Sequence, residues 1–196
     1  NSNPSLNNVF ITGNSASYAG GGFCSAYNSN PSLNNVFITG NSAMHGGGIM
    51  FCYDSNPNLY NVTITDNSAI GDIGSAGGGI HISFDSSPTL TDVLILDNSA
   101  VIYGGGIIIQ ENSNPDLNNV TISGNSAGHG GGITIGLNSN PILNNMIISD
   151  NIADSTGGGI LIAANSSPSL NDIIMTENSA FNAGGGMVIY DNSNPD

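Results

Sequence analysis

The sequence contains no lysine and no arginine among its 196 residues, against 14 aspartates and glutamates, so its formal net charge is −14. Average soluble proteins are about 25% charged, and roughly half of those residues are basic. Nucleic-acid binding depends on basic side chains that displace counterions, anionic membranes attract basic patches, and the phosphate-binding P-loop needs its lysine. The composition therefore excludes these three kinds of function. Positive charge can come from three histidines or from bound metal ions.

Other features are also scarce. There is no tryptophan, and the two cysteines say little about the redox compartment. No apolar run approaches the roughly 18 residues of a transmembrane helix, and a signal peptide would begin with positive charge, so we expect neither in this sequence. The mean hydropathy of +0.04 argues against disorder. Because the sequence begins with Asn1 rather than Met, we expect it to be a segment of a longer chain.

What the sequence does contain is a tandem repeat rich in asparagine and glycine. The stretch NSNPSLNNVFITGNSA occurs at 1–16 and again, unchanged, at 28–43. All eight prolines fall at one repeat position, and 21 of the 28 glycines form seven GGG triplets. We treat 1–196 as one solenoid domain with repeats at 1–27, 28–53, 54–84, 85–111, 112–137, 138–164 and 165–191, and a partial copy at 192–196.

Each repeat contains short segments with the pattern of β-strands. Apolar and polar residues alternate around Val9 and Ile11, and again after the glycines, as at Ile80 and Ile82, while a third short segment centres on leucines such as Leu6. A unit of about 26 residues cannot enclose a core alone and must stack on its copies. The sequence therefore predicts an all-β, single-stranded parallel β-helix, or β-solenoid, with about seven coils of 26–31 residues and three short strands per coil.

Stacking places the residues of one repeat position in a column. The asparagine of the NSA motif forms such a column, in which each side-chain amide can donate to the next coil and so build a structural ladder. Its members are Asn14, Asn41, Asn67, Asn98, Asn125, Asn151 and Asn178. The alanine two residues later is expected to point inward at a tight corner. The GGG triplets indicate positive φ angles or a close approach of one chain segment to another.

The pairing of ITGNSA with GGGI resembles the FxxN and GGAI repeats of the chlamydial polymorphic membrane proteins. More broadly it resembles the right-handed parallel β-helix proteins, whose fold is shared with pectate lyases. The resemblance covers essentially the whole chain, although Ile11, Ile38 and Ile64 stand where that family has phenylalanine, and GGG replaces GGA. It implies a right-handed coil and an extracellular or cell-surface location, because members of the first family are surface adhesins and autotransporter passengers.

From these observations we expect a structural extracellular β-solenoid that forms, or belongs to, a fibre or a surface adhesin. Neither end carries a visible capping segment, so either further coils follow or copies stack. Expected partners are other copies, end to end or laterally, and a host surface or glycan. Nucleic-acid binding and membrane insertion are not expected.

Two alternative functions remain open. One is a carbohydrate-binding or polysaccharide-cleaving β-helix, and the other is an ice-binding solenoid with a Thr-rich face. An enzyme is not expected, because pectate lyases use a basic residue and the Gly-His-Gly of the polygalacturonase-like enzymes, matched here around His129, lacks a neighbouring Asp cluster. Short loops also leave little cleft for a pair of carboxylates. We interpret His45, His81 and His129 as loop and surface residues.

Acidic residues stack in pairs on adjacent coils. Like charges about 4.8 Å apart repel, so these carboxylates either face water or hold a hard cation such as Ca²⁺. The candidate ligands are Asp66 with Asp97, Asp150 with Glu177, and Asp54 with Asp85. The long loop from Ile70 to Ala76, which contains Asp72, is a further place for a local site. No other cofactor is expected.

The remaining signals concern the surface. Sequons at Asn61, Asn119 and Asn165 would allow glycosylation. The Cα atoms of Cys24 and Cys52 are expected about 8 Å apart, beyond the roughly 7 Å limit for a disulfide, so we predict two free thiols. Two outward apolar columns predict an interface. They are Cys24, Met50, His81, Ile108, Thr134, Leu161 and Val188, and Phe10, Phe37, Thr63, Leu94, Thr121, Ile147 and Ile174.

Overall fold

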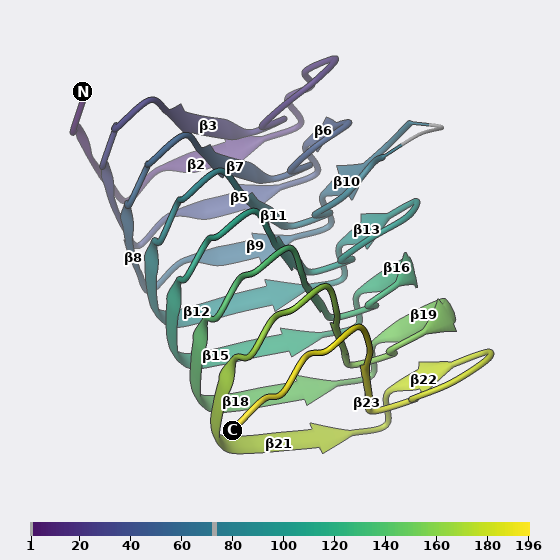
Figure 1. The fold of residues 1–196 in the computed structure, drawn as a ribbon. Helices are drawn as coiled ribbons and strands as arrows, with labels where there is room; N and C mark the ends of the chain where they lie inside the picture. The colour runs from purple at the N-terminus through teal and green to yellow at the C-terminus, as the bar shows by residue number, and fades with distance from the viewer. Residues whose placement is uncertain (1, 72–73) are drawn as a thin grey trace.

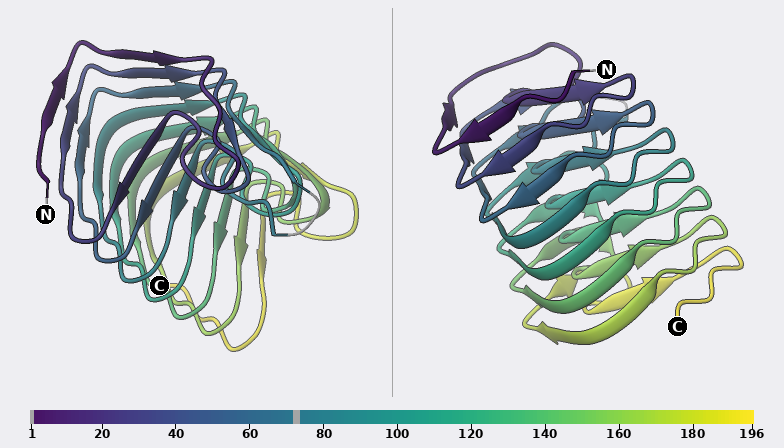
Figure 2. Two further views of the ribbon diagram at one scale, coloured as in Figure 1. Left: turned by 90° about the horizontal axis from the view of Figure 1, so that it is seen from above. Right: turned by 90° about the vertical axis from the view of Figure 1, so that its left-hand side faces the viewer.

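The protein is a rod of stacked coils. A computed structural model describes residues 2–71 and 74–196, and its coils follow one another along one axis from the N-terminus to the C-terminus (Figure 1). Seen down the axis, each coil is a closed turn of strands from which an arm projects on one side (Figure 2). The arm of each coil consists of the segment after its ladder asparagine and the loop that leads from there to the glycine triplet (Figure 1). This is the all-β parallel solenoid of about seven coils that the repeat predicts. Within the described residues, no helix is long and apolar enough to cross a membrane.

Three parallel sheets run along the rod. Every coil adds to sheets A and C, and every coil after the first adds a strand to sheet B. Sheet A contains β1 (Ser5–Asn7), β2 (Phe10–Thr12), β4 (Ser32–Asn34), β5 (Phe37–Thr39), β8 (Asn58–Tyr60), β9 (Thr63–Thr65), β12 (Thr89–Leu96), β15 (Asp116–Ser123), β18 (Ile142–Ser149) and β21 (Ser169–Thr176). Sheet B contains β6 (Ser42–Ala43), β10 (Ser68–Ala69), β13 (Ser99–Ala100), β16 (Ser126–His129), β19 (Ile152–Thr156) and β22 (Ser179–Ala180). Sheet C contains β3 (Phe23–Ala26), β7 (Ile49–Cys52), β11 (Ile80–Ile82), β14 (Ile107–Ile109), β17 (Ile133–Ile135), β20 (Ile160–Ile162) and β23 (Met187–Ile189).

The assignment of segments to sheets differs from the sequence-based expectation. The Leu segment and the Val-x-Ile segment both lie in sheet A, as separate strands in the first three coils and as one eight-residue strand in the last four. A residue with positive φ, such as Asn35 (54°) or Asn119 (55°), bends the chain between them. The third sheet is instead built around the Ser-Ala pair, whose alanine we expected at a tight corner. Sheet B forms the base of the arm (Figure 1).

Apolar side chains of equivalent positions fill the interior as columns. Ile38 pairs with Ile64, and Ile64 with Ile95, and all three are fully buried. Complete burial of an isoleucine contributes about 1.5–3 kcal/mol. Because each inward position repeats the same residue type from coil to coil, the core is continuous along the rod.

A ladder of asparagine side chains runs beside this core. Nδ2 of Asn67 donates to Oδ1 of Asn98 at 3.0 Å and to the carbonyl of Ile38 at 3.0 Å, while Oδ1 of Asn67 accepts from Asn41 at 2.9 Å. The same side-chain bond links all seven ladder asparagines, from Asn14 to Asn178, at 2.9–3.0 Å. Buried amides are thus satisfied by one another and by the backbone, as buried polar groups require.

The glycine triplets have both of the properties that the sequence suggests. Gly46 has a φ of 62°, where L-residues with a side chain are rare. A Cβ on Gly47 would lie 2.4 Å from the carbonyl carbon of Ser68 and 2.6 Å from the carbonyl oxygen of Gly78. The triplet therefore lets the chain return from the arm and pass directly over the next coil.

Candidate functional site

Most of the outward column of sheet C is buried, which contradicts one sequence-based expectation. We expected the column from Cys24 to Val188 to be an exposed stripe. Met50, His81 and Ile108 are instead only 5%, 3% and 3% exposed. The alternation of residues identified the outward positions, but it could not show that the arm and the turn after sheet C would cover them. His81 is therefore a buried residue and not a surface histidine.

Two hollows lie in line on this face and share Gln110. The first has a volume of about 180 Å³ and is lined by Tyr18, His45, Met50, His81, Phe84, Gln110 and Glu111. The second has a volume of about 250 Å³ and is lined mainly by apolar groups, from Tyr103, Ile108, Gln110, Thr134, Ile135, Gly136, Leu137, Leu161, Ala163 and Ala164. Together they form a groove along the rod, which we call the sheet C groove.

The first hollow holds the polar centre of the groove. The ring of His81 packs edge-on against His45 at 5.2 Å between centroids, and its Nε2 lies 3.2 Å from Nε2 of Gln110. Burial, with a smaller contribution from the charge of His45, lowers the pKa of His81 to about 3. Its imidazole is therefore neutral at physiological pH.

Two buried polar atoms of this hollow have no hydrogen-bond partner within the described residues. They are Nδ1 of His45 and Oε2 of Glu111. Burial lowers the pKa of His45 and raises the pKa of Glu111. Buried polar groups usually find partners, so unpaired atoms in a hollow indicate a place where a polar ligand or water can bind.

Aromatic rings form one wall beside the first hollow. Tyr27 stacks on Tyr53 at 4.8 Å with an interplanar angle of 2°, and Tyr53 stacks on Phe84 at 4.6 Å and 10°. All three residues have positive φ angles of 52–57°, and such a conformation is unusual for aromatic residues. The sequence-based interpretation missed this wall, although an aromatic residue at one repeat position in three successive copies was a visible signal.

The histidine of the Gly-His-Gly tripeptide lies away from any acidic cluster. His129 stacks on Tyr103 at 5.4 Å, and its Nδ1 lies 2.9 Å from Oγ1 of Thr156. Glu111 is the one carboxylate that lines either hollow among the residues the structure describes. The groove therefore does not present a pair of carboxylates of the kind that glycosidases use.

The acidic residues proposed as Ca²⁺ ligands lie outside the sheet C groove, and all of them have positive φ. The column that contains Asp66, Asp97, Asp150 and Glu177 has glycine in its other three coils, at Gly13, Gly40 and Gly124. Asp54 and Asp85 occupy a similar position in the turn after sheet C. A left-handed backbone favours Asp, Asn and Gly, which explains the residue choice without a metal.

The backbones of the paired residues lie on adjacent coils, since the N–H of Asp66 donates to the carbonyl of Leu96 at 3.2 Å and that of Asp150 to the carbonyl of Thr176 at 3.1 Å. Asp66 accepts a hydrogen bond from Oγ1 of Thr65 at 3.0 Å, and Asp150 from Oγ of Ser123 at 3.4 Å. Among residues 2–71 and 74–196, no group of three or more His, Cys, Asp or Glu could hold a metal ion. Asp72 lies outside the described residues. Ca²⁺ binding therefore stays a prediction in which most ligands would be carbonyls and amides.

The three sequons lie at exposed bends of the chain, and that of Asn119 lies within β15. Asn61, Asn119 and Asn165 are exposed and have φ angles of 52°, 55° and 60°. Nδ2 of Asn61 donates to Oδ1 of Asn35 at 3.2 Å, and Nδ2 of Asn119 donates to Oδ1 of Asp92. Their positions are accessible, and glycosylation stays a prediction.

Both cysteines are free, as predicted. Cys24 is exposed and Cys52 is buried, and they belong to neighbouring strands of sheet C with an offset of two residues. A hydrogen bond from the Cys52 thiol lowers the pKa of Cys24 to about 7, and the same bond raises the pKa of Cys52.

Comparison with known proteins identifies the fold family and nothing finer. The family described as "Right handed beta helix region" matches residues 69–196. No characterised protein and no solved structure matches the chain. The resemblance to the chlamydial adhesin repeats is therefore not confirmed, whereas the β-helix repeat itself is.

Proposed function

Because the chain belongs to the right-handed β-helix family, we propose that it is a structural extracellular β-solenoid that forms part of a fibre or a surface adhesin. The observation that carries this proposal is the in-register stacking of sheets A and C along the rod, whereas sheet B has one register shift, between Ala127 and His129. Leu6 pairs with Leu33 and Ile11 with Ile38, and each coil presents the same backbone edge to the next. Further coils can therefore be added to such a rod through the same stacking contacts.

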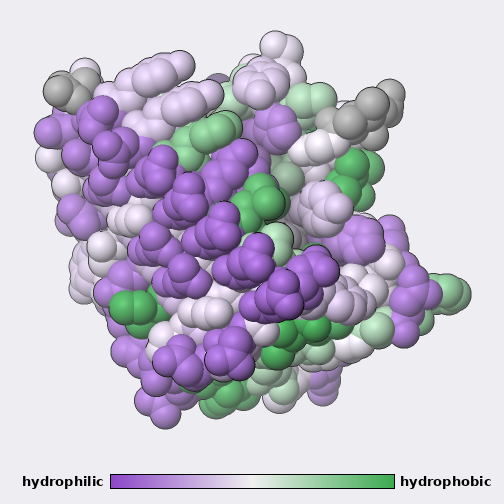
Figure 3. Space-filling view, viewed as in Figure 1, coloured by the Kyte–Doolittle hydropathy of each residue, from purple (hydrophilic) through white to green (hydrophobic). Residues whose placement is uncertain are grey.

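The surface of sheet A supports lateral contacts along this rod. Its outward column contains Phe10 (74% exposed), Leu94 (42%), Ile147 (45%) and Ile174 (58%). Hydrophilic residues dominate the side of the rod seen in Figure 3, with apolar residues in separate patches. An apolar column on such a polar surface is typical of an interface. We call this column the sheet A stripe and propose that it contacts other copies or a host surface.

Threonine substitutions within the sheet A stripe test the lateral contacts. Thr63 and Thr121 already occupy this column, so Leu94→Thr with Ile147→Thr should leave the fold intact. Sedimentation velocity should then show less lateral association, while Ile142→Thr, an exposed residue of sheet A outside the stripe, should show none of this loss. If the wild type, the double variant and Ile142→Thr associate equally, the sheet A stripe does not make the lateral contacts. Monodisperse short rods in negative-stain images would contradict assembly of this segment.

Carbohydrate binding in the sheet C groove is a second candidate function. The observation that favours it is the combination of stacked aromatic rings with unpaired polar atoms at His45 and Glu111. Sugar rings use both kinds of contact, since their C–H faces pack on aromatic rings and their hydroxyl groups form hydrogen bonds. A glycan array, read with the wild type and with Phe84→Ser, tests this candidate. Binding that persists unchanged in the variant would place the glycan elsewhere.

Ice binding has less support from the described surface. The expected Thr-rich column contains Leu96, and bulky exposed side chains such as Phe10 and Ile174 lie beside it. Absence of thermal hysteresis would exclude this function.

A further inference from the structure

Three sulfur-containing side chains lie on the outward face of sheet C in the first two coils, from Cys24, Met50 and Cys52. Cys24 in β3 pairs directly with Met50 in β7. Cys52 lies two residues beyond Met50 on the same strand, so it projects from the same face. Cys24 and Cys52 are therefore diagonal neighbours on one face of sheet C, and the Cys52 thiol lowers the pKa of Cys24 to about 7.

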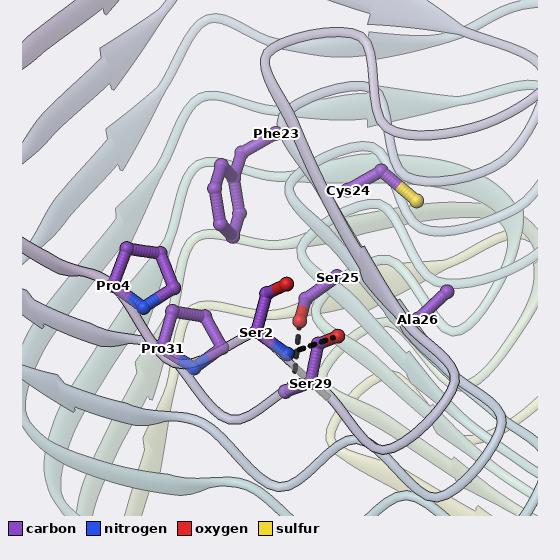
Figure 4. Close-up of a pocket in the computed structure, with 8 residues that line it drawn as sticks. All are labelled: Ser2, Pro4, Phe23, Cys24, Ser25, Ala26, Ser29 and Pro31. Carbon is purple, nitrogen blue, oxygen red and sulfur yellow. Dashed lines mark hydrogen bonds between the residues drawn. The ribbon is translucent and has the colours of Figure 1, made fainter.

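The residues around the two cysteines leave room for their thiols to approach each other. Phe23 and Ser25 point to one side of β3, while Cys24 and Ala26 point to the other (Figure 4). Ala26 is the direct neighbour of Cys52 across the strands. Its methyl group fills little of the space in which the sulfur of Cys24 can approach Cys52.

A buried polar atom without a partner lies beside the sulfurs. Ser83 follows Cys52 in the next coil, where its N–H donates to the carbonyl of Phe51 at 3.0 Å. Ser83 is fully buried, and its Oγ has no hydrogen-bond partner among the described residues. Its place on the same outward column indicates that the neighbourhood of Cys52 is arranged for more than apolar packing.

We propose that Cys24, Met50 and Cys52 form a binding site for a copper(I) ion. Thiolate and thioether sulfurs are soft ligands that select copper(I). Zinc sites in proteins use four ligands from Cys, His and carboxylates, and the thioether of Met50 does not belong to that set. The site is independent of the proposed rod assembly and of glycan binding.

The chemistry of binding is a ligand exchange without a change of oxidation state. Each thiol loses one proton to solvent, and the ion releases the acetonitrile or solvent ligands that it carries as it forms two bonds to Sγ and one bond to the Sδ of Met50. Cys24 is an exposed residue, so the ion can enter from its side. Met50 and Cys52 are 5% and 4% exposed, so they hold it away from water. A chain with no lysine or arginine also places no fixed positive charge against the cation.

Competition with a coloured copper(I) chelator tests the site. The purified chain is mixed anaerobically with the acetonitrile complex of copper(I), and the chelator bathocuproine disulfonate reports the free ion. We expect one ion per chain. Cys24→Ser and Cys52→Ser should each lower the affinity by at least the roughly 10- to 100-fold that loss of an outer-shell partner costs at known sites. Met50→Leu should weaken binding by a smaller factor.

A control substitution at another buried methionine distinguishes loss of the copper site from a general effect of replacing methionine by leucine. Met146→Leu changes a buried core methionine of sheet A and should leave the copper affinity unchanged. Circular dichroism melting shows that each variant is folded before titration. In urea, two thiols of the unfolded chain can still bind copper, but the difference between wild type and Met50→Leu should disappear.

Several outcomes would overturn the proposal. Copper that is lost completely to the chelator excludes the site, as does an affinity that is equal in wild type and Met50→Leu. An affinity in urea equal to that of the folded chain excludes a site built by the fold. If zinc binds more tightly than copper(I), and its affinity is equal in wild type and Met50→Leu, the site selects zinc and not copper(I).

Discussion

Individual side chains in this rod are chosen by their column, and the buried asparagines show this most clearly. A polar side chain is tolerated at full burial because every donor and acceptor has a partner in the adjacent coils. The acidic residues are also chosen by their column, because they occupy left-handed turn positions where glycine or asparagine stands in other coils. The role of a residue is therefore defined by its neighbours along the axis more than by its neighbours in sequence.

Removal of one ladder amide should be strongly destabilising. In Asn67→Ala, the carbonyl of Ile38 and the side chains of Asn41 and Asn98 lose their bonds to Asn67. Since each buried unsatisfied group costs about 1–3 kcal/mol, we expect a loss of at least about 3 kcal/mol in urea unfolding. Asn58→Ala, an exposed asparagine of the same coil, should change stability little. Equal losses in both variants would contradict the structural role of the ladder.

The buried His81 should make stability depend on pH. Its folded pKa of about 3 lies below the ordinary value of 6.5, so below pH 6.5 the unfolded chain takes up a proton that the folded chain does not. Stability is then complete above pH 6.5 and falls as the pH decreases toward 3, by about 2 kcal/mol between pH 6.5 and 5. His45 and Glu111 face the same hollow and titrate too.

His81→Leu isolates the contribution of this ring. Leucine stands in the same column at Leu161, so the substitution suits the site. Unfolding free energies measured at several pH values, without added metal, should show a shallower decline from pH 6.5 to 5 in the variant. Parallel curves for variant and wild type would show that His81 is not buried in its neutral form.

The elements of each coil are held together where the glycine triplet crosses sheet B of the next coil. No side chain fits at Gly47, because backbone atoms of Ser68 and Gly78 occupy the space. We therefore expect Gly47→Ala to destabilise the rod by about 1–3 kcal/mol, as overpacking does in other cores. The control is Gly136→Ala, where the new methyl group would lie 3.8 Å from the carbonyl oxygen of Ala163. Thermal melting of the two variants checks the difference. A melting temperature of Gly47→Ala equal to that of the wild type would show that the triplet and sheet B are not in close contact.

The repeat predicted the stacking of these elements, because identical residues at equal spacing can pack only on one another. It also predicted the inward positions, since Leu, Val and Ile alternate with polar residues. It did not predict that the column through Met50 and His81 would be covered, because alternation reveals the side of a sheet and not what lies over it. The sheet C groove likewise depends on how far the arms and the turn after sheet C reach across the strands, which a repeat pattern does not encode.

The whole rod carries its charge without any internal neutralisation. Its net charge is −14, and no lysine or arginine is present to offset it. Like charges on a compact body repel and lower its stability. At 0.1 M ionic strength the Debye length is about 10 Å, longer than the spacing of about 4.8 Å between coils, so carboxylates on adjacent coils are only partly screened.

Added salt should therefore stabilise the protein, and calcium allows a sharper test. We expect the melting temperature to rise with NaCl because screening weakens the repulsion. If the stacked Asp66 and Asp97 share Ca²⁺, as their spacing suggests, then Ca²⁺ at matched ionic strength should raise the melting temperature further. This extra rise should vanish in Asp66→Asn with Asp97→Asn. It should persist in Asp92→Asn with Asp172→Asn, which removes the same charge from a column with asparagine neighbours. A melting temperature that is equal in Ca²⁺ and in chelator would show that these carboxylates are only solvated, and that the rod tolerates their repulsion through its core and its ladder alone.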